Sequence, residues 1–359
     1  MDSQNPPGDE VKIAGFVSSY LKALGLETKT YAFSDKRVNV LAILKGKKHK
    51  KSLLLTPHLD TVPAGKNWKT HPFDARIVGD KIYGLGATDC KGNLASCLEA
   101  INSIVEDGIK LNYDLVFAAT ADEESGSALG LIPLLERKLL KPDAAVVLDA
   151  DDFEIVITQK GLMHLKVYIK GRKAHGAYPW LGVNAIDIAA EIIVDLKKQR
   201  INYRKNKYLR QPTINVGTIC GGDKVNVVSD WCEFGLDFRF LPGESEKRIL
   251  ASLRKTISKY TRNFRIEIQG VQDPYSINSN HPLVKGLSSA MKNLKIKPRI
   301  SGSEGATVIT FFKLKNIPAV ATGFGTESCA HIADEYAHLS NLYNGAKVLV
   351  SFLKDYKSS

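Results

Sequence analysis

The sequence has few cysteines and no long apolar run, and each of these deficits excludes a class of protein. Its five cysteines are scattered over 359 residues without a Cys-x-x-Cys pair. This pattern argues against a disulfide framework or a thiolate zinc site and favours a reducing compartment. No apolar run approaches the roughly 20 residues that span a bilayer. Because the opening residues, MDSQNPPGDE, also lack the features of a secretory signal, we expect a cytoplasmic protein without membrane contact.

The charge balance is basic, with a formal net charge of +12 and a pI near 9.3. Cations cluster in KGKKHKK (45–51) and in KKQRINYRKNKYLR (197–210), and the second cluster interleaves tyrosines as single-strand nucleic-acid surfaces do. The other cations are spread along the chain, and short basic runs are most often solvated turns or helix faces. We therefore keep nucleic-acid binding only as a remote alternative and expect no nucleic-acid partner. A positive field also attracts anionic substrates.

Helical and extended patterns alternate over the first 150 residues. Apolar residues recur with helical spacing at 10–26 and 93–108. Strand-like apolar runs occupy RVNVLAILKG, SLLLTPHLD, YDLVFAATADEE and DAAVVLDADD. Strands separated by helices predict an α/β domain whose central sheet is at least partly parallel and is flanked by helices.

The pattern changes near residue 160. Strand-like alternation appears in LMHLKVYIKG, PTINVGTIC, WCEFGLDFRFLP and FRIEIQG, with helical segments at 184–199 and 244–260 between them. The order strand–helix–strand–strand–helix–strand predicts a ferredoxin-like α+β module. After about residue 275 the α/β pattern returns. We therefore predict a discontinuous catalytic domain, 1–160 and 275–359, with a smaller α+β domain, 161–274, inserted in it.

Imidazole and carboxylate side chains follow several predicted strands of the α/β domain. Each has a structural explanation by itself, such as a helix N-cap, a solvated turn or a packed histidine. Together they would place several like charges at one edge of the sheet, where ligands bind in open α/β folds. A bound cation resolves that repulsion. The residues concerned are His58, Asp60, Asp89, Glu123, Glu124, Asp149 and His331.

The donor types indicate which cation these side chains bind. Imidazole and carboxylate without thiolate suit zinc, or cobalt or manganese as substitutes. Two histidines and at least three carboxylates exceed the needs of one catalytic zinc ion and fit two ions that share a carboxylate. His58 and Asp60 point to the same side of an extended segment, so Asp60 can fix the tautomer of His58. Glu123 and Glu124 face different ways, which leaves one of them free as a general base.

These motifs resemble a zinc-dependent amidohydrolase and peptidase family that includes acetylornithine deacetylase, succinyl-diaminopimelate desuccinylase, aminoacylase, peptidase T and glutamate carboxypeptidase. TPHLDTVPAG, YGLGATDCKGNLAS and ATADEESGS occur in the family's order and spacing, and the likeness covers nearly the whole chain. The resemblance implies two divalent metal ions. It assigns His58 and Asp149 to one ion, Glu124 and His331 to the other, Asp89 to both, Asp60 to the orientation of His58 and Glu123 to general-base catalysis.

The resemblance extends into the middle of the chain. GRKAHGAYPWLGVNAI resembles the family's lid and dimerisation motif, which implies a homodimer in which His175 stabilises the oxyanion in the partner subunit's site. The segment 217–242 resembles the one that supplies Asn226 and Arg239 to the substrate carboxylate or the tetrahedral intermediate. SGSEGATVITFFKLKNIPAVATGFG resembles the substrate-pocket loop and the strand after it, with Glu304 where Asp is frequent in the family.

Three further features depart from the family pattern. Asp149 stands where Glu is commonest, and Cys90 replaces the usual Met after the bridging aspartate. The family normally has a helix before the motif that SQNPPGDE resembles, and this sequence starts at the motif.

The implied reaction is metal-assisted hydrolysis of an amide bond. We expect an N-acyl amino acid as substrate, in a deacetylase or desuccinylase reaction, and the positive net charge mildly favours an acidic acyl group. A dipeptidase or carboxypeptidase of the same family, acting on a short peptide, is the alternative. The metal ligands themselves do not distinguish these substrates.

Overall fold

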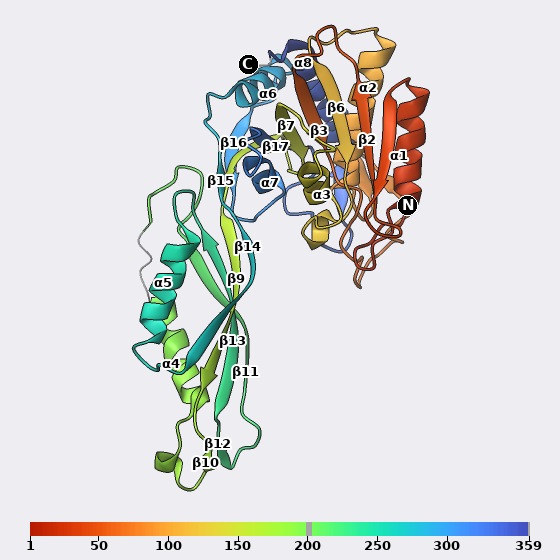
Figure 1. The fold of residues 1–359 in the computed structure, drawn as a ribbon. Coiled ribbons are helices and arrows are strands. Elements are labelled where there is room, and N and C mark those ends of the chain that lie inside the picture. Colours follow the sequence, from red (N-terminus) through yellow and green to blue (C-terminus); the bar gives the residue numbers. More distant parts are fainter. Residues whose placement is uncertain (199–202, 358–359) are drawn as a thin grey trace. The chain divides into compact units, whose positions relative to one another are not determined.

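The computed structural model describes residues 1–198 and 203–357, in two compact units (Figure 1). Unit 1 comprises Met1–Ile157, Ile277–Ser301 and Val308–Ser359, and unit 2 comprises Thr158–Ser276 and Gly302–Thr307. Part of the second basic cluster, 199–202, lies outside the described residues.

Unit 1 is built on a mixed sheet with flanking helices, which is the α/β fold expected from the sequence (Figure 1). At its centre β3 runs parallel to β6 and β7, and β17 runs parallel to β7, whereas β1, β2 and β8 are antiparallel to their neighbours. The strand order is β1 (Glu27–Ala32), β2 (Val38–Leu44), β6 (Asp114–Ala119), β3 (Ser52–Thr56), β7 (Ala144–Leu148), β17 (Ala319–Thr322), β8 (Glu154–Gln159) and β15 (Tyr275–Ser276), and β16 (Arg299–Ser303) also pairs with β8.

The central strands are buried because helices cover the sheet, and their sequences are correspondingly apolar along their whole length, as in SLLLT and AAVVL. Helix α2 packs against α8, and α6 also packs against α8. Helix α1 ends at Ala23, and the φ of 80° at Gly25 allows the backbone amides of Gly25 and Leu26 to close the last turn on Lys22 and Leu21. The helices of unit 1 are α1 (Val11–Ala23), α2 (Lys91–Glu106), α3 (Leu131–Glu136), α6 (Pro282–Asn293), α7 (Ile309–Lys313) and α8 (Leu339–Asp355).

A second, small sheet in unit 1 connects two segments that are far apart in the sequence. Its order is β18 (Tyr336–His338), β5 (Lys81–Tyr83) and β4 (Arg76–Val78). Tyr336 pairs with Tyr83, so the segment after His331 lies beside the loop that leads to Asp89. This pairing has no signal in the sequence, because the strands are short and about 250 residues apart.

Unit 2 is an antiparallel four-stranded sheet with α4 (Ala185–Lys198) and α5 (Glu246–Ile257) on one face (Figure 1). Alternate residues of its two central strands, from Met163 to Ile169 and from Cys232 to Phe240, pack under both helices. The chain order β9-α4-β11-β13-α5-β14 and the spatial order β11-β13-β9-β14 are those of a ferredoxin-like module. The strands are β9 (Gly161–Lys170), β11 (Thr213–Gly221), β13 (Trp231–Phe240) and β14 (Phe264–Gln272).

The predicted domain boundaries need one correction. The sequence placed 275–359 wholly in the catalytic domain, but Gly302–Thr307 packs with unit 2. In this segment Glu304 pairs with the buried Lys160 at 2.6 Å, and Thr307 bonds to Gln159. These contacts join positions about 145 residues apart, which local sequence patterns do not encode.

The described structure is in keeping with two deficits of the sequence. All five cysteines are free thiols. Within 1–198 and 203–357, no helix combines the length and the apolar character that a membrane crossing requires.

Candidate functional site

The candidate metal ligands meet at one edge of the unit 1 sheet. His58 follows β3, Glu123 and Glu124 form the short 3-10 turn η1 (Glu123–Ser125) after β6, and Asp149 follows β7. Because β3, β6 and β7 are parallel, their carboxyl ends lie at the same edge. Asp89 precedes α2, and His331 lies in the loop between β17 and β18.

One group of ligand atoms is centred on His58. Its Nε2 atom lies 2.9 Å from Oδ1 of Asp89 and 3.9 Å from Oδ1 of Asp149. One ligand atom from each of His58, Glu123 and Asp149 lies within 4.8 Å of the others. The ring of His58 is 2% exposed, so these atoms form the floor of the site.

A second group is centred on His331, which is half exposed. Its Nε2 atom lies 3.0 Å from Oδ2 of Asp89 and 3.3 Å from Oε2 of Glu124. Asp89 therefore uses one carboxylate oxygen toward each histidine. Its side chain does not cap α2, whose N-cap residue is Cys90, and the Cys90 side chain makes no capping hydrogen bond to the helix.

The structure changes how Asp60 contacts His58. The Nδ1–H of His58 donates to the main-chain carbonyl of Asp60 at 3.0 Å, while the Asp60 carboxylate lies 3.6 Å away. That carboxylate accepts instead from the backbone amides of Glu123, at 3.1 Å, and Glu124, at 3.2 Å. Asp60 thus holds the η1 turn with its side chain and leaves Nε2 of His58 facing Asp89.

Cys90 lies close enough to His58 and Asp89 to complete a third group of donors. Its Sγ accepts from the backbone amide of His58 at 3.1 Å and donates to the carbonyl of His58 at 3.4 Å. Burial raises the pKa of the Cys90 thiol to about 12. Without a bound ion Cys90 is therefore a thiol, and its two hydrogen bonds support the backbone of His58.

The electrostatics of the site fit bound cations. Burial, reinforced by Asp149, raises the pKa of Glu123 well above its usual value, and burial with Asp89 raises the pKa of Asp149 to about 7. Hydrogen bonds to Asp89 and Glu124 raise the pKa of His331 to about 10. Oε1 of Glu124 is buried and has no hydrogen-bond partner among the described residues. Four crowded carboxyls, one with an unsatisfied oxygen, match the demand of divalent ions for oxygen and imidazole ligands.

A buried polar network beneath the site was not anticipated from the sequence. Asn5 donates to the Asp60 carboxylate at 2.9 Å and to Asp122 at 3.3 Å. Arg37 donates to Asp122 at 2.9 Å and pairs with Glu10 at 3.1 Å. The network ties the N-terminal segment to the η1 turn. Its only signal in the sequence is the polar segment SQNPPGDE, to which no partner could be assigned.

The remaining predicted residues lie in unit 2, at two different ends of its sheet. His175 on β10 (Ala174–His175) pairs with Val227 on β12 (Val227–Val228), and the amide of Gly176 donates to the carbonyl of Asn226 at 2.8 Å. His175 and Asn226 are both exposed neighbours.

Arg239 lies toward the other end of unit 2. Its guanidinium bonds to Asp237 at 2.8 and 3.1 Å. At a rise of about 3.3 Å per residue along β13, Arg239 is roughly 26 Å from Trp231. Strands β10 and β12 lie near the Trp231 end of β13. Glu304 is on the Arg239 side, where it contacts Lys160. Unit 2 therefore does not bring Arg239 together with His175 and Asn226.

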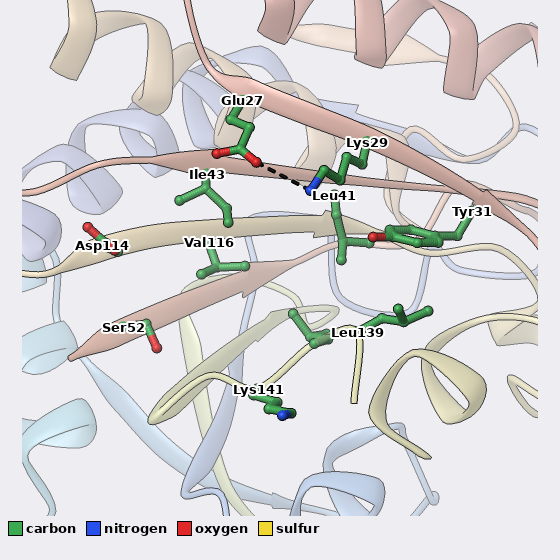
Figure 2. A pocket seen from close by; sticks show the side chains of 11 residues that line it. Glu27, Lys29, Tyr31, Leu41, Ile43, Ser52, Asp114, Val116, Leu139 and Lys141 are labelled. Atoms are coloured by element: carbon green, nitrogen blue, oxygen red, sulfur yellow. Dashed lines mark ion pairs between the residues drawn. The ribbon is translucent and has the colours of Figure 1, made fainter. Parts of the chain in front are cut away.

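A pocket of about 260 Å³ in unit 1 is separate from these residues (Figure 2). Its lining includes Leu41, Val116, Ser52 and Asp114, together with an ion pair between Glu27 and Lys29. Ser52 and Asp114 are the first residues of β3 and β6, so the pocket lies at the amino ends of the parallel strands. The carboxylates and histidines gather at the opposite ends, which are the usual ligand-binding ends of such sheets.

Comparisons with known proteins agree with this geometry. Residues 54–355 match the model of Peptidase family M20/M25/M40. An acetylornithine deacetylase of Vibrio cholerae is 29% identical, over 99% of this chain and 94% of its own length. A tripeptidase from Staphylococcus aureus superposes with a TM-score of 0.81 and 26% identity, covering 99% of this chain and 94% of its own. An aminopeptidase from Bacillus cereus shares the fold with a TM-score of 0.82 and 23% identity, over 99% and 94% of the two chains.

The family match covers most of the chain, and the matched region contains the histidines and carboxylates that could hold metal ions. The chain therefore belongs to Peptidase family M20/M25/M40 and is a metal-binding hydrolase of amide bonds.

Proposed function

We propose that this protein hydrolyses the amide bond of an N-acyl amino acid with the help of two divalent metal ions, zinc by preference and cobalt or manganese as substitutes. The observation that carries the proposal is the position of Asp89, whose two carboxylate oxygens face His58 and His331 at 2.9 and 3.0 Å. A carboxylate shared between two histidine-centred groups is the arrangement that a two-ion site requires.

Each ion has its own set of ligands in this proposal. His58 and Asp149 would hold one ion, Glu124 and His331 would hold the other, and Asp89 would contact both. When bound, the two ions polarise the carbonyl of the substrate and lower the pKa of the attacking water. The unsatisfied Oε1 of Glu124 supports its place in the set, since metal coordination satisfies a buried carboxylate oxygen.

Glu123 is left as the general base. Its backbone is held by Asp60, and its carboxyl lies beside His58 and Asp149 without an ion pair to either histidine among the described contacts. In this role Glu123 takes a proton from the attacking water and delivers it to the nitrogen of the leaving amine. Burial raises the pKa of Glu123 above its usual value, which makes its carboxylate a stronger base toward the attacking water.

The choice of substrate rests on the relatives. The 29% identity to an acetylornithine deacetylase over almost the full length favours an N-acyl amino acid. The likeness to a tripeptidase makes short peptides the alternative, since the ligand set serves either amide. Neither substrate needs a nucleic-acid partner, and the lysines of 45–51 lie in the turn between β2 and β3, at the amino end of β3.

A turnover screen tests this function. We expect purified protein to hydrolyse N-acetyl-ornithine or N-succinyl-diaminopimelate faster than simple dipeptides, measured by the release of free amine. Incubation with a chelator should reduce the rate to background, because the carbonyl is then no longer polarised, and added Zn²⁺, Co²⁺ or Mn²⁺ should restore it. Faster turnover of dipeptides would select the peptidase alternative. Full activity after verified metal removal would contradict the metal-dependent mechanism.

We further propose that the protein works as a homodimer in which unit 2 supplies His175 to the partner's site. Within unit 2, His175 and Arg239 are too far apart to touch one small substrate together. Apolar side chains are exposed on the same unit, with Trp180 72% and Ile219 54% accessible, and β11, which carries Ile219, is an edge strand. An exposed apolar surface next to an open strand edge is typical of an interface.

Subunit mixing tests the role of His175. We expect His175→Ala and Glu123→Gln to be nearly inactive alone, because each lacks one part of the catalytic machinery. The two variants would be mixed in equal amounts under conditions in which folded subunits exchange. Half of the dimers would then be mixed, with one of their two sites complete, so the mixture should recover about a quarter of wild-type activity. Size-exclusion chromatography reports the dimer. Full activity of His175→Ala, or no recovery in a mixture shown to exchange subunits, would exclude supply in trans.

A further inference from the structure

We propose that Glu335 is a positioning residue that sets the place of Asp89 and thereby controls the affinity of the His331-centred metal site. Glu335 is 1% exposed and follows His331 by four positions. The inference rests on the proposed two-metal function, because it concerns how this chain holds one ligand of that centre.

The carboxylate of Glu335 is enclosed by the loop that carries Asp89. One oxygen accepts from the backbone amides of Thr88, at 2.8 Å, and Asp89, at 3.0 Å, and the other accepts from Gly86 at 2.9 Å. Gly86 has a φ of 86°, a conformation that turns its amide inward and that side chains disfavour. Three charge-assisted bonds from one buried carboxylate hold this loop in a single conformation.

The main chain around Glu335 holds the same loop. The carbonyl of Glu335 accepts from the amide of Gly84 at 2.9 Å, and the carbonyl of Tyr336 accepts from the hydroxyl of Thr88 at 2.7 Å. Because Glu335 and His331 belong to one short segment, a single anchor places both Asp89 and His331. The backbone between them is irregular, with positive φ at His331 and Asp334, so no helix or strand performs this task.

The effect of Glu335 should differ between the two metal sites. His58, Glu123 and Asp149 are placed by β3, β6 and β7, which are central strands of the sheet. In the second group, Asp89 and His331 both lie in loops, and these loops meet at Glu335. Because Asp89 serves both ions in the proposed centre, loosening the anchor should weaken both sites, and it should weaken the His331-centred site more, since two of its ligands depend on the anchor.

Metal titration of the full-length protein tests the inference. Metal-free wild type and Glu335→Gln would be titrated with Co²⁺ against a chromophoric chelator, and the visible absorption of bound Co²⁺ would be recorded. The Gln side chain has one oxygen that accepts hydrogen bonds and one NH₂ group that only donates, so Glu335→Gln loses the backbone bonds that one of the two Glu335 oxygens accepts. We expect one of the two binding steps to lose about 10- to 100-fold in affinity, with a clearly smaller loss in the other step and an altered Co²⁺ spectrum.

Asp114→Asn serves as the matched control. Asp114 is a poorly exposed carboxylate of the same unit that accepts the backbone amide of Gly46 at 2.8 Å, at the opposite end of β6. Asp114→Asn should lower the melting temperature without changing either affinity. If Glu335→Gln does not fold, Glu335→Asp, which keeps the charge and shortens the arm, is expected to show the same unequal loss.

The possible outcomes distinguish failure of the Glu335 inference from failure of the proposed two-metal function. Wild-type protein that binds no divalent ion would overturn the proposed function and this inference with it. Wild-type protein with two ions, together with a folded Glu335 variant that has unchanged or equally weakened affinities, would overturn the inference alone. A lower melting temperature with an unchanged Co²⁺ spectrum would likewise show that Glu335 is only structural.

Discussion

Replacement of Glu123 by Gln is expected to lower kcat by about 10²- to 10⁴-fold while both metal ions stay bound. Gln preserves the size of the side chain and its backbone bond to Asp60 but cannot accept the proton of the attacking water. Because the ligands of both ions remain, KM should change only a few-fold, which indicates loss of a group that acts in the transition state. The measurements are steady-state kinetics and metal content on the same preparation.

Glu124→Gln is the neighbouring control. Glu124 lies 3.3 Å from His331, so its replacement should reduce metal affinity as well as activity, and excess metal should restore part of the rate. Glu123→Gln should not respond to excess metal. If Glu123→Gln retained full activity, or if it lost metal as Glu124→Gln does, Glu123 would be a ligand or a bystander and not the general base.

Replacement of Asp89 by Asn should remove activity more completely than loss of any other ligand, by at least about 10³-fold. Asp89 faces both histidines with separate oxygens, and an amide offers only one oxygen and no negative charge. We therefore expect metal content to fall from two ions to one or none, measured by elemental analysis after dialysis. His331→Ala, in contrast, should keep one ion, because the His58-centred group is not touched.

Asp152→Asn is the matched control for Asp89→Asn. Asp152 lies in the same DADD segment as Asp149, but its carboxylate accepts from Asn341 at 3.0 Å and from the amide of Glu327 at 3.1 Å. It should keep both ions and most of the activity. Retention of two ions by Asp89→Asn, or loss of an ion by Asp152→Asn, would show that the shared ligand has been assigned incorrectly.

The elements with strong local patterns were predictable. The run SLLLT and the helical spacing before Glu106 gave β3 and α2 to within a few residues, because burial of whole strands and of one helix face leaves a clear apolar pattern. The prediction missed β8, which lies immediately after the DADD segment, and the small sheet of β4, β5 and β18. These strands are short or follow acidic residues, and their pairing depends on partners far away in the chain.

The candidate ligands were predictable for a related reason. His58, Glu123 and Asp149 each follow a buried strand, and parallel strands bring their carboxyl ends to one edge whatever their separation in sequence. His331 and Asp89 do not follow this rule, since both lie in loops. Both were also predicted to follow strands, and the family resemblance only assigned them to individual ions. Their meeting at 3.0 Å is a property of the folded chain.

What the sequence by itself determined about this protein is its α/β fold and its family, and it supplied the candidate metal ligands, because strand burial and residue type are local properties. Only the tertiary structure decided how these side chains are held. It placed the Asp60 carboxylate on the η1 turn, moved Gly302–Thr307 into unit 2 and enclosed Glu335 in the Asp89 loop. Each of these features depends on hydrogen bonds or ion pairs between segments that are far apart in the sequence. The periodicity of apolar residues within one segment does not predict such contacts.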